Sequence, residues 1–333
     1  MLQGHQTWVF NSKPSIIGSA AIGGPFEAQG NLAKDFDLLH GDIWLGQDSY
    51  EQAEKKFLEQ ACETAIKKAG LKKEDIQFFL SGDLINQIMP SSFTARTLAA
   101  PFLGIYGACS SSMEGLSLAS LLIDSGFAQN ALVGTSSHNA ASEKQYRYPT
   151  EYGAQKPPTA QWTVTGAGAA VVARQGKGPR VVASTIGRVI DMGLSDPFNM
   201  GAAMAPAAVD TIEAHFRDLN ISPLHYDLIT TGDLGRVGHR IAGDLLKKHG
   251  LDIPVEKLTD CGILMYKEDQ PVLAGGSGCA CVATTTFGHL LNRMRRGELN
   301  RILVIATGAL LSPMSYQQKE TIPCIAHAVS IEM

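Results

Sequence analysis

The stretch Phe102-Leu-Gly-Ile-Tyr-Gly-Ala-Cys-Ser-Ser-Ser-Met-Glu-Gly115 decides the fold. Its apolar beginning, residues 102–106, predicts a buried strand, and the mostly apolar residues 116–123 predict a helix. Cys109 lies where the strand gives way to the helix. Because free N–H groups at a helix start stabilise an anion, a thiol there can have a lowered pKa and act as a nucleophile. The alternative is a buried cysteine that only packs. Which of the two applies depends on the groups around Cys109.

The composition is that of a globular protein with a large core. Its 333 residues are 44% hydrophobic and 18% charged, which favours two domains or one duplicated unit. The net charge of −4 offers no basic surface for nucleic acid or an anionic membrane. The cysteines are scattered, which favours reduced thiols. Residues 1–10 lack the pattern of a signal peptide, and no stretch reaches the roughly 20 apolar residues of a membrane span. We therefore expect a soluble protein that reaches a membrane only through a partner.

The second half of the chain repeats the first. Residues 71–84, which end in Ser-Gly-Asp-Leu, align with residues 221–234, which end in Thr-Gly-Asp-Leu, at a constant offset of 150 positions. A later helix and strand repeat at an offset of about 170 positions. An ordered series of such matches predicts an α/β fold made of two duplicated halves. We place the halves at residues 1–175 and 176–333, because the run Arg-Gln-Gly-Lys-Gly-Pro-Arg at 174–180 separates the two copies.

The Gly-Ala-Cys-Ser-Ser-Ser-x-Glu-Gly pattern at 107–115 resembles the nucleophile turn of the thiolase and ketoacyl-synthase superfamily. The resemblance implies a layered αβαβα fold, an active cleft where the halves meet, and a homodimer. Condensing enzymes of this superfamily also use a histidine from a His-Gln-Ala-Asn segment and an asparagine from a Gly-Asn-Thr-Ser-Ala segment. The matching positions here hold Gly232 and Ser277. Since losing one such group generally costs on the order of 10²–10⁴ in rate, the resemblance implies a non-catalytic cleft that can still bind a small ligand.

The chain as a whole resembles the family of stage V sporulation protein AD from spore-forming Firmicutes. The resemblance is carried by residues 107–115, 148–153, 161–170, 231–238 and 275–279. It implies a protein that binds dipicolinic acid (pyridine-2,6-dicarboxylate), together with calcium, without transforming it. It further implies a role in moving this compound into the developing spore and out at germination. The implied partners are membrane proteins of the same transport system at the spore inner membrane, with no nucleic acid, no cofactor and no metal site of the protein's own.

A flat aromatic dianion needs an apolar slot for its ring and charge-assisted donors for its carboxylates. We expect Arg236 to supply a guanidinium clamp, although a solvated arginine at a helix start is the alternative. Asp233 can orient Arg236 or act through calcium, or it can be a structural turn residue like its counterpart Asp83. His138 can face the cleft or be a satisfied loop residue. With the two helix starts and the turn that replaces the superfamily histidine, the predicted ligand-binding set is Cys109, Ser110, His138, Gly232, Asp233, Arg236 and Ser277.

Two other functions stay open at this point. An acyl transferase or ketoacyl synthase could use Cys109 with a rearranged base, His138 or His239. Alternatively, the fold could be a scaffold whose polar segment 139–162, rich in tyrosine and proline, docks a membrane complex. In that case Tyr148 and Tyr152 would matter more than the cleft.

Overall fold

The computed structural model describes residues 1–149, 151 and 155–333. Its central feature is a continuous mixed sheet that folds over into two layers, and each half of the chain contributes five strands, in the same spatial order, to one layer. The first half contributes β3 (Ser15–Gly23), β9 (Gly166–Ala173), β7 (Asn130–Ser137), β5 (Phe78–Gly82) and β6 (Phe102–Gly104). The second half contributes β10 (Arg180–Thr185), β15 (Cys324–Glu332), β14 (Arg301–Ala309), β11 (Leu228–Thr231) and β12 (Leu258–Asp260).

The pairing pattern of the two halves is also the same. In each half the first two neighbour pairs in this order are antiparallel and the last two are parallel. The halves meet where β10 pairs with β3, at Arg180 and Ser15. This internal repeat confirms the predicted α/β fold of two duplicated halves. The border that we placed at 175/176 falls in the connection between β9 and β10.

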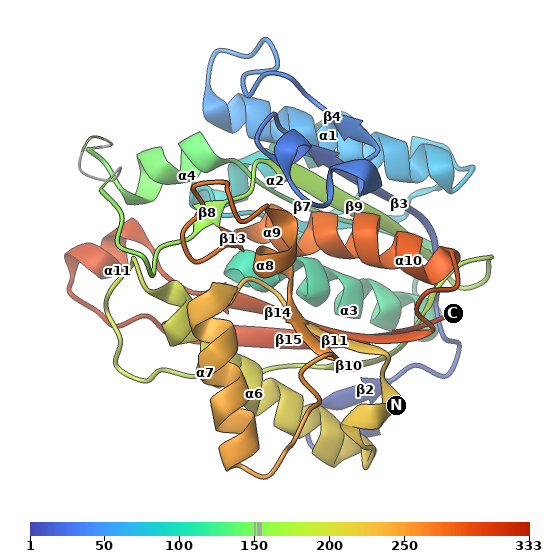
Figure 1. The fold of residues 1–333 in the computed structure, drawn as a ribbon. Helices are drawn as coiled ribbons and strands as arrows, with labels where there is room; N and C mark the ends of the chain where they lie inside the picture. Colours follow the sequence, from blue (N-terminus) through green and yellow to red (C-terminus); the bar gives the residue numbers. More distant parts are fainter. Residues whose placement is uncertain (150, 152–154) are drawn as a thin grey trace.

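Helices complete five layers, αβαβα, which follow one another from top to bottom in Figure 1. The outer layer of the first half consists of α1 (Tyr50–Lys68) and α2 (Met89–Leu98), and that of the second half of α6 (Met200–Leu219) and α7 (Gly235–Lys248). The middle layer consists of α3 (Ser111–Asp124) and of α9 (Cys279–Thr284), which continues as a π-helix (Thr285–Leu290) and α10 (Leu291–Arg295). Helix α3 packs against β5 and β7 on one side and against β14 and β15 on the other.

The shorter elements lie around this core. They are β1 (Leu2–Gln3), β2 (Thr7–Val9), β4 (Leu38–Leu39), α4 (Asn139–Tyr146), β8 (Trp162–Thr163), α8 (Cys261–Met265), β13 (Gly276–Ser277) and α11 (Pro313–Gln317). Strands β8 and β13 form a separate parallel pair that joins the two halves beside the middle layer. No helix within the described ranges is both long and apolar enough to cross a membrane.

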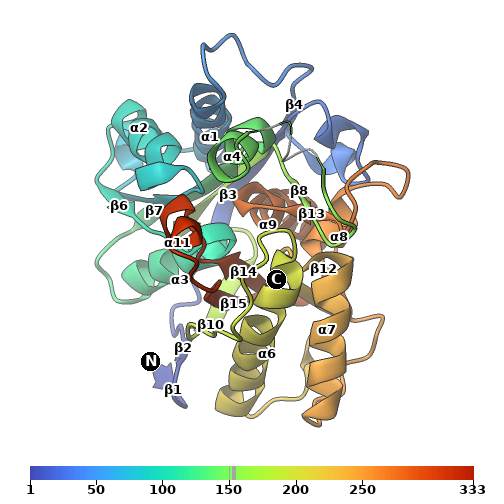
Figure 2. The same cartoon turned by 90° about the vertical axis from the view of Figure 1, so that its left-hand side faces the viewer.

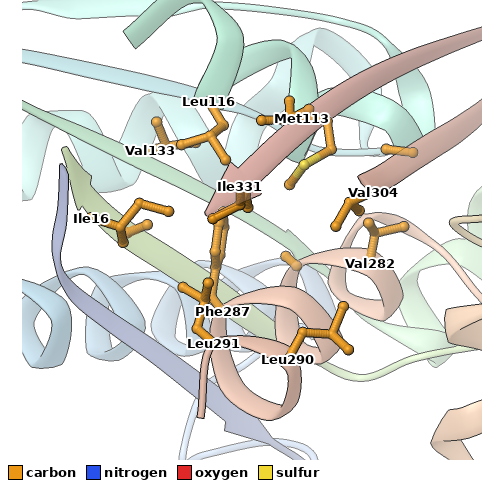
Figure 3. Close-up of a cluster of buried hydrophobic side chains, with 14 of the residues drawn as sticks. Ile16, Met113, Leu116, Val133, Val282, Phe287, Leu290, Leu291, Val304 and Ile331 are labelled. Atoms are coloured by element: carbon orange, nitrogen blue, oxygen red, sulfur yellow. The ribbon is translucent and has the colours of Figure 1, made fainter. Parts of the chain in front are cut away.

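The largest apolar cluster fills the space between the sheets and the middle helices. Met113 and Leu116 on α3 face Phe287 and Leu291 of the other middle helix, and Ile331 on β15 lies between them (Figure 3). All five side chains are fully or almost fully buried. Burying a side chain of this size stabilises the fold by roughly 1.5–3 kcal/mol, so the middle layer ties the two halves together.

One predicted strand differs from the structure. Residues 102–106 were expected to form a buried strand, but β6 is the last strand of its sheet and Leu103 is 43% exposed. The apolar residues do form a strand, but its place at the edge of the sheet leaves them partly exposed. The polar segment 139–162 begins as α4, and Tyr152 lies outside the described residues.

Candidate functional site

Cys109 lies in a tight turn at the start of α3. A single 3-10 turn, Ala108–Ser110, precedes the helix, and Ala108 adopts a positive φ of 49°. A non-glycine residue in this region is strained and persists only where its surroundings hold it. Here Ser110 Oγ donates to the Gly107 carbonyl at 2.6 Å, and Ser111 Oγ donates to the Ala108 carbonyl at 2.8 Å. Ser110, predicted as a ligand donor, therefore has its hydroxyl engaged within its own turn.

Asp233 lies beside the Cys109 thiol at the end of β11. Its carboxylate accepts hydrogen bonds from Ser277 Oγ and Gly278 N, both at 2.9 Å, and from Thr307 Oγ1 at 2.8 Å. Burial raises the pKa of Asp233 to about 6 in spite of these donors. Burial also raises the pKa of Cys109 well above its ordinary value, and the negative charge of Asp233 raises it further. The thiol is therefore held in its protonated form.

Gly232, predicted as part of the ligand site, is required by packing. A Cβ at this position would approach Thr307 N to 2.8 Å and Val282 Cγ2 to 2.9 Å. Ser277 lies on β13 and, besides its bond to Asp233, lines the cavity next to Cys109. The two positions that match the superfamily base and asparagine are thus a packing glycine and a serine bound to a carboxylate.

The cavity next to Cys109, which we call the inner cavity, measures about 60 Å³. Among the described residues its lining contains no histidine; it consists of Leu84, Cys109, Ser142, Tyr146, Arg147, Gln161, Thr163, Pro197, Phe198, Met200 and Ser277. Arg147 is the cation of this lining, and its side chain is only 12% exposed. The guanidinium lies over the Phe198 ring, 5.3 Å from its centre, and Nε finds no acceptor within the described part of the chain.

Sequence reasoning missed Arg147. It follows α4 directly, in the run Tyr146-Arg147-Tyr148, and the signal was a single basic residue inside a tyrosine-rich segment. The expected clamp, Arg236, is exposed on α7 and donates from Nη1 to the Leu273 carbonyl at 2.7 Å. Arg236 is not among the inner-cavity residues. Whether it contacts a ligand stays a prediction.

The two histidines considered as bases lie elsewhere. His138 caps α4: its Nδ1 accepts from Ala141 N at 3.4 Å, and its Nε2 lies 2.9 Å from the Ile43 carbonyl. Burial lowers the pKa of His138. His239 lies on α7 and lines a cavity against the segment 251–258. Neither histidine lines the inner cavity, so neither is placed to deprotonate Cys109.

A two-fold repeated αβαβα sandwich with a cysteine at the start of its first middle helix defines a thiolase-like fold. Solved structures agree with this class. A 3-oxoacyl-[acyl-carrier-protein] synthase III from Aquifex aeolicus VF5 is 17% identical, with a TM-score of 0.61 over 96% of this chain and 100% of that one. A variant of OleA from Xanthomonas campestris is 17% identical, with a TM-score of 0.66 over the full length of both chains. At this identity the likeness concerns the fold.

The particular family follows from the sequence as a whole. The family model of stage V sporulation protein AD (SpoVAD) matches residues 4–332. Stage V sporulation protein AD of Bacillus subtilis (strain 168) is 50% identical over 331 residues, which cover 99% of this chain and 98% of that protein. The chain belongs to the stage V sporulation protein AD family. This confirms the resemblance seen in the sequence and makes the chain a sporulation protein with a thiolase-like fold.

Proposed function

We propose that the protein binds dipicolinic acid without transforming it and supports its uptake into the developing spore and its release at germination. The observation that carries this proposal is the carboxyl group of Asp233 beside Cys109. A cysteine nucleophile reacts as its thiolate, which needs a positive or basic neighbour. A buried carboxylate has the opposite effect, because it raises the pKa of the thiol. The cleft of a former condensing enzyme then serves as a receptor.

The lining of the inner cavity offers the groups that a planar aromatic dicarboxylate needs. Arg147 presents a guanidinium with an unpaired Nε–H among the described residues, and such forks bind carboxylates with two parallel hydrogen bonds. Phe198 and Met200 provide apolar surface for the ring, whereas the Ser277 hydroxyl is already donated to Asp233. Because the inner cavity measures only about 60 Å³, we place one carboxylate in it and let the ring extend past Gln161.

The proposal includes calcium as a counter-ion carried by the ligand. Over the described part of the chain, no three His, Cys, Asp or Glu side chains cluster closely enough to hold a metal ion. We assign calcium to the carboxylates of the ligand, because calcium prefers oxygen ligands of this kind. A homodimer, and membrane proteins of the same transport system as partners at the spore inner membrane, complete the proposal on the strength of the family.

Isothermal titration of the full chain with dipicolinate tests the proposal, with pyridine monocarboxylates as controls. We expect saturable binding that Arg147→Gln weakens at least about 10-fold, because a hydrogen bond to a charged group contributes roughly 1.5–3 kcal/mol. Arg188→Gln is the matched control, since its exposed guanidinium pairs with Asp210 and does not line the inner cavity. Absence of heat, together with no protection from thermal unfolding, would reject the proposed function.

Acyl transfer is the second candidate, favoured by the strained nucleophile turn that keeps Ala108 at positive φ. It predicts a covalent adduct on Cys109 after incubation with acyl-CoA, detected by intact mass and absent in Cys109→Ala. Such an adduct would replace the receptor proposal by a catalytic one.

A further inference from the structure

A second and larger cavity of about 410 Å³ adjoins the inner one, and we call it the outer cavity. It opens between α4 and the segment that precedes β13, elements that lie together on the face shown in Figure 2. Gln161 lines both cavities, which makes them neighbours. The outer lining combines an aromatic wall with charged and amide groups: Trp162, Lys156, Glu143 and Asn139.

A three-residue ion network crosses the border between the cavities. The Glu143 carboxylate accepts a hydrogen bond from Lys156 Nζ at 2.7 Å and also pairs with the Arg147 guanidinium. Lys156 and Glu143 line the outer cavity, whereas Arg147 lines the inner one. The three side chains are between 12% and 15% exposed. One carboxylate therefore serves two largely buried cations, which leaves a net positive charge at the border.

Both cations also lie on aromatic faces. Lys156 Nζ is 5.3 Å from the centre of the Trp162 ring, and the Arg147 guanidinium is equally far from that of Phe198. Each cavity thus pairs one cation with one aromatic ring, which suits a ligand that is both planar and anionic.

We propose that the outer cavity is the entrance for the dicarboxylate and that Glu143 is an internal carboxylate which the ligand displaces, first from Lys156 and then from Arg147. This inference rests on the proposed function. Leaving a buried cation unpaired is costly, but exchanging one carboxylate for another keeps each cation paired throughout. Two carboxylates on one rigid ring can satisfy both cations at once, whereas a monocarboxylate satisfies only one and competes poorly with Glu143. Glu143 therefore determines the selectivity for dicarboxylates.

The test compares three variants of α4 and its surroundings in the full chain. Glu143→Gln removes the competing charge, so we expect dipicolinate to bind about 10-fold more tightly and its advantage over pyridine-2-carboxylate to shrink by a similar factor. Lys156→Gln should weaken dipicolinate binding about 10-fold. Lys144→Gln is the matched control: Lys144 lies on the same helix and pairs with Glu51 at 2.9 Å, away from both cavities. Its affinity should equal that of the wild type.

Tryptophan fluorescence of the wild type, compared with Trp162→Phe, reports directly on the outer cavity, and phenylalanine keeps an aromatic ring beside Lys156. Quenching by dipicolinate that disappears in Trp162→Phe supports the inference. Binding heat without this quenching, or with unchanged affinity in Lys156→Gln, overturns the inference and leaves the proposed function standing. Absence of binding heat in the wild type would reject both the inference and the proposed function.

Discussion

Asp83 and Asp233 occupy equivalent places in the two halves, each after a Gly at the end of an equivalent parallel strand, β5 or β11. Both are fully buried, yet they face different partners. Asp83 accepts from Ile85 N and from the backbone and hydroxyl of Ser91, so it serves its own turn and the helix that follows. Asp233 instead accepts from Ser277, Gly278 and Thr307 and faces Cys109.

The neighbouring strand explains this difference. In the second half Asp260 ends β12 opposite Thr231, whereas in the first half Gly104 ends β6 opposite Ser81. Asp260 accepts from Leu234 N at 2.9 Å and from Gly235 N at 3.1 Å, which satisfies the start of α7. Gly104 has no side chain to do this, so Asp83 must satisfy the turn itself. The Gly-Asp pair thus has a structural role in the first half and lines up with the cleft in the second half. The difference comes from the neighbouring strand, which ends in Asp260 in one half and in Gly104 in the other.

The helix starts differ in a related way. Cys109 and Cys279 are 170 positions apart, the offset of the repeated helix, and each begins its segment of the middle layer. Cys279 Sγ donates a hydrogen bond to the Ala108 carbonyl at 3.0 Å and so stabilises the strained turn. Cys109 lines the inner cavity. The Cys279 thiol therefore stabilises the turn, whereas the Cys109 thiol is part of the candidate site.

Of the substitutions that test the difference between the two aspartates, Asp260→Ala should change the stability of the protein most. It removes the acceptor of two buried N–H groups, Leu234 and Gly235, and of the Thr231 hydroxyl. Since each unpaired buried donor costs about 1–3 kcal/mol, we expect a loss of about 3–5 kcal/mol in the free energy of unfolding, measured with urea. Asp260→Asn keeps an acceptor and should lose less than half of that. A loss under about 1 kcal/mol for Asp260→Ala would mean that Asp233 can serve its own turn, as Asp83 does.

A second difference between the halves gives a pH-dependent prediction. His215 on α6 and Tyr226 replace the apolar Ala65 and Ile76 of the first half at the 150-residue offset. The imidazole is bonded to Thr185 Oγ1 at 2.7 Å and to Tyr226 Oη at 2.6 Å, and burial lowers its pKa from 6.5 to about 3.

Between these pKa values the unfolded chain binds a proton that the folded protein does not, so stability falls as the pH is lowered. Lowering the pH from 6.5 to 5 should cost the wild type roughly 1.5 kcal/mol that His215→Gln does not lose. Urea unfolding of both proteins at several pH values measures this. Parallel profiles for the two would show that His215 is already protonated in the folded protein or that its proton is shared.

Local patterns in the sequence were sufficient to predict helices and strands and to recognise the internal repeat. The apolar run 116–123 located α3, and the Gly-Asp-Leu match located the ends of β5 and β11. The site depended on contacts between distant segments, which local patterns do not encode. Arg147 lines the inner cavity because of where α4 ends in space, and Asp233 faces Cys109 because Asp260 serves the turn. The exposure of β6 depended likewise on its place in the sheet order.

Asp233→Asn should change stability little and the chemistry of Cys109 measurably. Asparagine can still accept from Ser277 and Gly278, but it removes the negative charge that helps to raise the pKa of Cys109. The pKa of Cys109 should therefore fall, and alkylation of Cys109 by iodoacetamide near pH 8 should become faster, by on the order of 10-fold. Asp83→Asn is the matched control, because Asp233 is the leading charge that raises the pKa of Cys109, whereas Asp83 is the leading charge that raises the pKa of Cys279. Equal rates at Cys109 in Asp233→Asn and the wild type would mean that burial alone holds this thiol protonated, and the contrast between the two aspartates would then concern hydrogen bonding only.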